Sequence, residues 1–128
     1  MLGAADPAQY PRAVELFEQV AASPDVTPIW RNQAFFLAGR TLEKMGERAR
    51  ALASYHRVLE QKDDPGVEPE YYWYYRAGFA AAGLLEADRR WESAVRVYSA
   101  LADSDGPRAA EAGMRLKELR LQHFLWEE

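Results

Sequence analysis

The side chains that could hold a metal ion or transfer protons are few and scattered along the chain. The two histidines, His56 and His123, have no acidic or cysteine partner at the spacing of metal ligands, and the chain contains no Cys. Asp63 and Asp64 are adjacent, but no further carboxylates follow them at the spacing of a calcium-binding loop. We therefore expect no metal site and no cofactor.

Nucleophilic catalysis lacks a recognisable arrangement as well. The sequence contains no His-Glu-x-x-His, no glycine-rich phosphate loop and no Gly-x-Ser-x-Gly elbow. No base is recognisable beside any of the serines in turns or on helices, which are Ser23, Ser54, Ser93, Ser99 and Ser104. We predict no catalytic residues and a protein that is not an enzyme.

The run of five aromatic residues at positions 71–75 is the more informative feature. In one interpretation these side chains pack where two structural repeats meet, through Tyr71, Trp73, Tyr74 and Tyr75. A helix cannot bury five consecutive aromatic side chains, so we expect some of Tyr72, Trp73 and Arg76 to remain partly exposed. Tyr and Trp bury a large area at low entropic cost and keep a polar group, so an exposed patch of them suits a binding surface.

Composition narrows the class of partner. Of the 128 residues 48% are hydrophobic, enough for a core, and the net charge of −4 argues against nucleic acid or an anionic membrane. No apolar run approaches the ~20 residues that span a bilayer, so we expect no membrane insertion. The N-terminus lacks the basic start and apolar core of a signal peptide, and composition leaves the compartment open.

The architecture is clearest in residues 34–59, which read as two helices joined at Gly46. Apolar residues recur at steps of three and four on both sides of this glycine. They are Phe35, Ala38, Gly39, Leu42 and Met45 before it, and Ala51, Leu52, Tyr55, Val58 and Leu59 after it. Gly46 fits a helix C-terminus, because glycine adopts a left-handed backbone without a Cβ clash, so the helices should pack antiparallel.

The second-helix pattern of Ala51, Tyr55 and Val58 occurs three times. It recurs as Ala94, Tyr98 and Leu101, and as Ala13, Phe17 and Val20 in a first helix that lacks a first-helix partner. We therefore suspect a domain cut from a longer chain. Residues 1–7 should be a flexible lead-in and residues 8–128 a single domain, with helices near 8–22, 28–45, 47–61, 69–88, 91–103 and 107–125.

These motifs resemble the tetratricopeptide repeat. Ala38 and Gly39 stand where that family has its Leu-Gly pair, followed by Leu42, Gly46, Ala51, Tyr55 and Val58 at its large, glycine, alanine, aromatic and small positions. Phe35 replaces the usual Trp, and Asp63 stands where the closing Pro is common. The pattern alanines lie roughly 38 and 43 residues apart, against ~34 in the standard repeat. Such longer repeats are similar to those of bacterial envelope proteins, namely the outer-membrane assembly lipoproteins and the Tol-Pal accessory protein, which would favour the periplasm.

The resemblance implies a concave surface lined by the first helix of each hairpin. By phase, its residues are Gln33, Phe36, Arg40, Glu43, Arg76, Phe79, Gly83 and Glu86, extended by Tyr72 and Trp73 of the aromatic run. We predict an all-α, right-handed solenoid of about six helices in three antiparallel hairpins. Its function would be non-catalytic binding of a protein segment with acidic groups or a free carboxylate. The alternative is a structural or self-association module, in which the aromatic run and the last helix form a homodimer or dock onto a longer chain.

Overall fold

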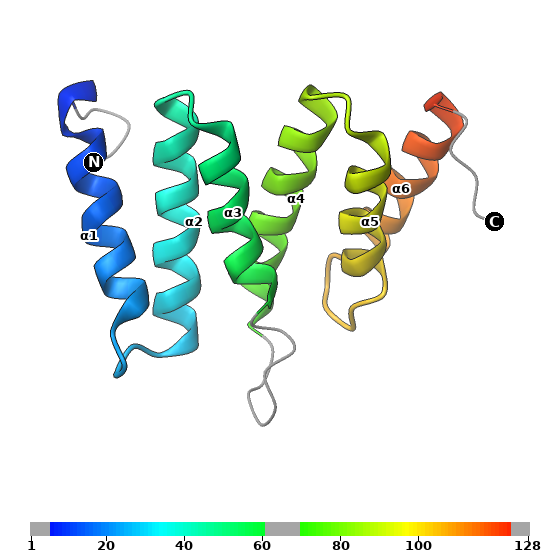
Figure 1. The fold of residues 1–128 in the computed structure, drawn as a ribbon. Coiled ribbons are helices and arrows are strands. Elements are labelled where there is room, and N and C mark those ends of the chain that lie inside the picture. The colour runs from blue at the N-terminus through cyan, green and yellow to red at the C-terminus, as the bar shows by residue number, and fades with distance from the viewer. Residues whose placement is uncertain (1–5, 61–69, 124–128) are drawn as a thin grey trace. The chain divides into compact units, whose positions relative to one another are not determined.

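The computed structural model describes residues 6–60 and 70–123, and this part of the chain is entirely helical, without a strand (Figure 1). The all-α fold class is therefore confirmed. A 3-10 turn, η2 (Pro7–Gln9), leads into six helices, which are α1 (Tyr10–Ala22), α2 (Pro28–Lys44), α3 (Arg48–Glu60), α4 (Tyr71–Ala87), α5 (Trp91–Ala102) and α6 (Ala109–His123).

Some expectations fall on residues 1–5, 61–69 and 124–128 and lie outside the described residues. They are most of the lead-in, the Asp63–Asp64 pair and the helix limits near 61, 69 and 125. Two other limits differ from expectation for local reasons. The Asp6 carboxylate accepts a hydrogen bond from the Ala8 backbone N–H at 3.0 Å, which holds residues 7–9 in a 3-10 turn before α1 begins. Residues 107–108 form a turn ahead of α6.

The chain reverses between α2 and α3 at Gly46, as predicted. Gly46 has a φ of +79°, and the Glu47 N–H donates to the Leu42 carbonyl at 2.9 Å, the arrangement of a helix closed by a left-handed residue. The same closure recurs after α4, where the Arg90 N–H donates to the Leu85 carbonyl at 2.8 Å. There the left-handed residue is Arg89, with φ 59°, which carries a Cβ that this conformation disfavours.

Close approach of α2 and α3 depends on Gly39. A Cβ on this residue would lie 2.5 Å from Tyr55 Cε1, closer than real atoms pack, so the tyrosine ring occupies the space that a side chain would fill. Ala38, Leu42 and Ala51 are buried around this contact. The hairpin of α4 and α5 buries the corresponding residues Ala81, Leu85, Ala94, Tyr98 and Leu101.

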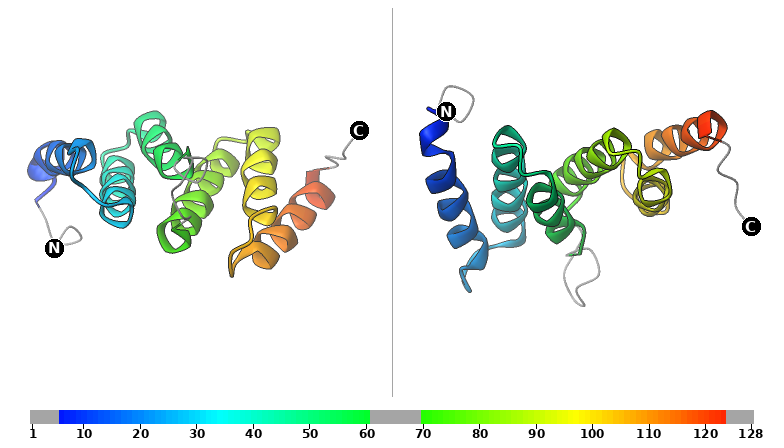
Figure 2. Two further views of the ribbon diagram at one scale, coloured as in Figure 1. Left: turned by 90° about the horizontal axis from the view of Figure 1, so that it is seen from below. Right: turned by 45° about the horizontal axis from the view of Figure 1, so that its top comes forward.

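The chain divides into two compact units, residues 1–77 and residues 78–128, with the division inside α4. In the first unit α2 lies between α1 and α3 and packs against both (Figure 2). In the second unit α5 packs against α6. The single domain over residues 8–128 and the right-handed stack of hairpins stay predictions.

Candidate protein-binding surface

Some side chains of the aromatic run at the start of α4 are buried, and others are exposed. Tyr74 and Tyr75 are buried, and the Tyr71 ring stacks on Tyr75 with centroids 5.6 Å apart. Tyr72 is 60% exposed, Trp73 is half-buried and Arg76 is exposed. The prediction that some of these three residues remain partly exposed is confirmed.

Glu70 sets the start of α4 and therefore the positions of these side chains. Its carboxylate accepts hydrogen bonds from the backbone N–H groups of Tyr72 at 3.0 Å and Trp73 at 3.3 Å, which would otherwise lack partners in the first helical turn. It also accepts from Nδ2 of the buried Asn32 in α2 at 3.4 Å. The same side chain thus caps α4 and ties it to α2.

The exposed Arg76 lies against three aromatic rings, of which Tyr72 is exposed, Trp73 is half-buried and Phe36, a predicted binding residue, is buried at 4% exposure. Its guanidinium carbon is 5.2 Å from the centroid of Phe36 in α2 and 5.3 Å from the centroids of both Tyr72 and Trp73. Arg40 approaches the same Phe36 ring at 6.0 Å. We call these five residues, Phe36, Arg40, Tyr72, Trp73 and Arg76, the aromatic–arginine cluster.

The aromatic rings of this cluster contact one another. Phe36 and Trp73 have centroids 5.4 Å apart, and Tyr72 meets Trp73 edge to face at 4.8 Å. Within the described part of the chain neither Arg40 nor Arg76 forms an ion pair with a carboxylate. Arg76 has one weak hydrogen bond, from Nη1 to the Tyr72 hydroxyl at 3.4 Å. Two guanidinium groups, oriented by aromatic faces and without an internal carboxylate, suit recognition of an external anionic group.

Two further predicted residues lie beside this cluster on α2. The Gln33 side chain is half-buried. The Glu43 carboxylate accepts a short hydrogen bond from the Tyr55 hydroxyl, so it is engaged within the hairpin. Burial, followed by this hydrogen bond, raises the pKa of Tyr55 above its ordinary value, because both favour the neutral phenol.

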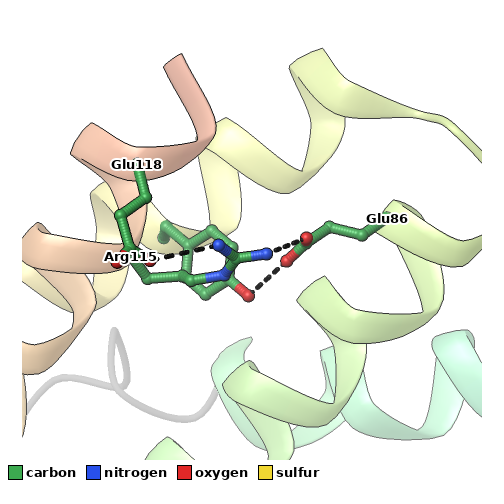
Figure 3. A network of polar contacts seen from close by, with 4 residues as sticks. Glu86, Arg115 and Glu118 are labelled. Atoms are coloured by element: carbon green, nitrogen blue, oxygen red, sulfur yellow. Dashed lines mark hydrogen bonds and ion pairs between the residues drawn. The ribbon is translucent and has the colours of Figure 1, made fainter. Parts of the chain in front are cut away.

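The remaining two predicted residues, Phe79 and Glu86, belong to the second unit. Phe79 lies against the Tyr98 ring at 5.9 Å and beneath the Arg108 guanidinium at 4.3 Å. Glu86 accepts a hydrogen bond from the Tyr98 hydroxyl at 2.6 Å and pairs with Arg115 of α6 (Figure 3). Burial, and then the bond to Glu86, raise the pKa of Tyr98 to about 12.

Sequence reasoning missed the arginines of α6 and the paired Tyr–Glu hydrogen bonds. Arg115 bonds to Glu86 and also to Glu118, with Nη1 and Oε1 3.2 Å apart in the second pair (Figure 3). A signal for the tyrosine bonds was present, because Glu43 precedes Tyr55 by the same interval of 12 residues as Glu86 precedes Tyr98.

Among the described residues there is no group of acidic or histidine side chains that could hold a metal ion. None of the described helices is both long enough and apolar enough to cross a membrane.

The fold and these packing contacts define an all-α helical-repeat protein. Residues 34–68, which begin within α2 and include all of α3, match the family model of the tetratricopeptide repeat. This match supports a tetratricopeptide repeat in the chain, and such repeats generally serve as non-catalytic scaffolds for protein–protein interactions. Comparison with curated proteins found no match. Comparison with solved structures found none either.

Proposed function

We propose that this protein is a scaffold that binds a segment of a partner protein, with the aromatic–arginine cluster as the centre of the binding surface. The observation that carries the proposal is the environment of Arg76. The guanidinium carbon of this exposed arginine lies within 5.3 Å of the centroids of three aromatic rings. No carboxylate in the described part of the chain forms an ion pair with it. Interface hot spots are enriched in Tyr, Trp and Arg, which is the composition of this cluster.

The chemistry of the cluster favours an acidic segment or a free carboxylate as the ligand. A carboxylate can accept two parallel hydrogen bonds from one guanidinium, and the rings restrict the orientations that the guanidinium can take. Apolar side chains of the partner would cover Tyr72, which offers a ring that is 60% exposed. Gln33 and Glu43 would flank this contact on α2, whereas a role for Phe79 and Glu86 of the second unit stays a prediction.

The proposal is tested by partner capture from a native extract with matched charge-reversal variants. Arg76→Glu should lose the partner, whereas Arg96→Glu should retain it. Arg96 is an exposed arginine on α5 that hydrogen-bonds Ser93 at 3.1 Å and lies outside the proposed surface. The captured segment is then synthesised with its carboxylates replaced by amides, which should weaken binding by about tenfold or more. Equal capture by both variants, or equal affinity of the amide peptide, would rule out this surface.

A structural or self-association role is the second candidate function. The observation that favours it is the stack of His123 on Trp91, with centroids 3.8 Å apart, which fixes the end of α6 against α5. Leu121, beside this stack in sequence, is 57% exposed. An elution volume that changes with protein concentration on a sizing column, and that Leu121→Glu makes constant, would favour this role.

We also propose a bacterial cell-envelope setting. Its support is the likeness of the long repeats to those of the outer-membrane assembly lipoproteins and the Tol-Pal accessory protein. Fractionation of cells that carry the native gene, followed by detection of the protein in the periplasmic or the cytoplasmic fraction, tests the setting directly.

A further inference from the structure

α1 carries the second-helix pattern, yet the residues of this pattern are only partly covered, since Ala13 and Phe17 are half-buried and Val20 is exposed. Its positions Ala13, Phe17 and Val20 correspond to Ala51, Tyr55 and Val58 of α3. Val20 is 47% exposed, whereas Val58 is 1% exposed. Leu16, four residues before Val20, is also exposed. The residues that α1 buries are a different pair, Val14 and Ala21.

α6 carries the first-helix pattern, and the residues of this pattern are likewise incompletely covered. Its segment Ala112-Gly113-x-x-Leu116 repeats Ala38-Gly39-x-x-Leu42 of α2. Where the Tyr55 ring fills the space beside Gly39, a Cβ on Gly113 would meet only the Ala102 Cβ, at 3.9 Å. Leu116 is half-buried, although Leu42 is 1% exposed. The space beside Gly113 is therefore open where the Tyr55 ring lies beside Gly39 in the first hairpin, and we call this space the notch.

The polar positions of the two helices also complement each other. In both complete hairpins a second-helix Tyr donates to the first-helix Glu that follows the pattern Leu, in the pairs Tyr55–Glu43 and Tyr98–Glu86. α1 has Phe17 at the Tyr position, without a hydroxyl, and α6 has Lys117 at the Glu position. Glu18 directly follows Phe17, and both Glu18 and Lys117 are exposed without an ion pair in the described part of the chain.

We propose that α1 of one molecule docks on α6 of a second copy as the second helix of an intermolecular hairpin. Phe17 occupies the notch at Gly113, Leu16 and Val20 cover the apolar face that includes Leu116, and Glu18 lies near Lys117. The contact is head-to-tail, so each added copy leaves one α1 and one α6 open, and assembly ends in rings or in filaments. This inference specifies one form of the self-association role given above as the second candidate function. It does not depend on the aromatic–arginine cluster, and its failure would leave the proposed partner-binding scaffold standing.

The test measures the mass of the full chain against concentration by sedimentation velocity. Gly113→Leu fills the notch and Val20→Glu places a charge on the face of α1. Each should shift association to concentrations about tenfold higher or more, because a filled notch or a buried charge opposes docking. Gly83→Leu is the matched control, since a Cβ there meets nothing within 4 Å and Gly83 lies outside both faces, and it should associate as the wild type does.

Mixing the two blocked variants makes the test specific for head-to-tail contact. Gly113→Leu retains an intact α1 and Val20→Glu retains an intact α6, so an equimolar mixture should form a heterodimer that grows no further. Formation of this dimer also shows that both variants are folded. A wild type that stays monomeric at every concentration would overturn the proposal in favour of another occupant of these faces. Unchanged self-association of either variant alone, or a mixture that stays monomeric, would overturn it too.

Discussion

The close approach of the Tyr55 ring to Gly39 leads to a prediction about the stability of Gly39→Ala. In Gly39→Ala the new methyl would lie 2.5 Å from Cε1 of Tyr55 and 2.8 Å from two further ring atoms. The ring has no free space to enter, because Tyr55 is fully buried, hydrogen-bonded to Glu43 and in contact with Phe36 at 5.7 Å. Replacing a helical glycine by alanine normally stabilises by about 1 kcal/mol.

Overpacking of a filled core costs about 1–3 kcal/mol, which equals or exceeds the gain of about 1 kcal/mol in helix propensity. We therefore expect Gly39→Ala to lower the free energy of unfolding by up to about 2 kcal/mol, measured by urea titration with far-UV circular dichroism. Gly83→Ala, on open helix surface, should raise it by up to about 1 kcal/mol.

The same substitution in a Tyr55→Leu background isolates the cause. Without the ring, the added methyl has room, so Gly39→Ala should become neutral or stabilising in that background. The difference between the two backgrounds is the interaction energy between the two positions. An equal effect of Gly39→Ala with and without the tyrosine ring would refute the reasoning.

The remaining predictions concern one backbone strain and two titrating groups. Arg89→Gly should raise the free energy of unfolding by about 1 kcal/mol, because φ 59° disfavours a residue with a Cβ, and urea titration measures it. The pKa of Tyr98 is raised to about 12 from its ordinary 10.0, so its contribution to stability is complete below pH 10 and is lost as the pH rises towards 12. Tyr98→Phe should flatten this alkaline decline in denaturation midpoints, and an unchanged decline would show that Glu86 and Tyr98 are not its source. The hydrogen bond from Arg108 lowers the pKa of Glu111, so Arg108→Gln should raise that pKa in a carboxyl NMR titration.

The hairpin contacts were predictable because they depend on local periodicity. Steps of three and four place Ala38, Gly39 and Leu42 on one face whatever surrounds the helix. The glycine at position 46 indicated a left-handed closure, and the structure has it. At Arg89 the sequence contained no such indication, because the backbone there is set by the packing of the hairpin rather than by the residue.

The sites were less predictable, because they join residues from helices far apart in the chain. Arg76 was expected to be exposed, but its place over Phe36 depends on how α4 lies against α2, about 40 residues earlier. The link from Arg115 to Glu86 depends in the same way on the packing of α6. Periodicity assigns each residue to a face of its own helix, but it does not predict which helix faces pack together or at what angle.

The sequence by itself therefore determined the all-α class, the two kinds of helix and the turn at Gly46. It also determined the absence of cysteine chemistry, since that follows from composition alone. Only the tertiary structure decided that Glu43 and Glu86 are engaged by tyrosines, while the arginines of the aromatic–arginine cluster have no carboxylate paired with them in the described part of the chain. The physical reason is the distance along the chain over which each effect acts. Backbone preference and amphipathicity act within a few residues, whereas these ion pairs and ring contacts require separate helices to be packed together.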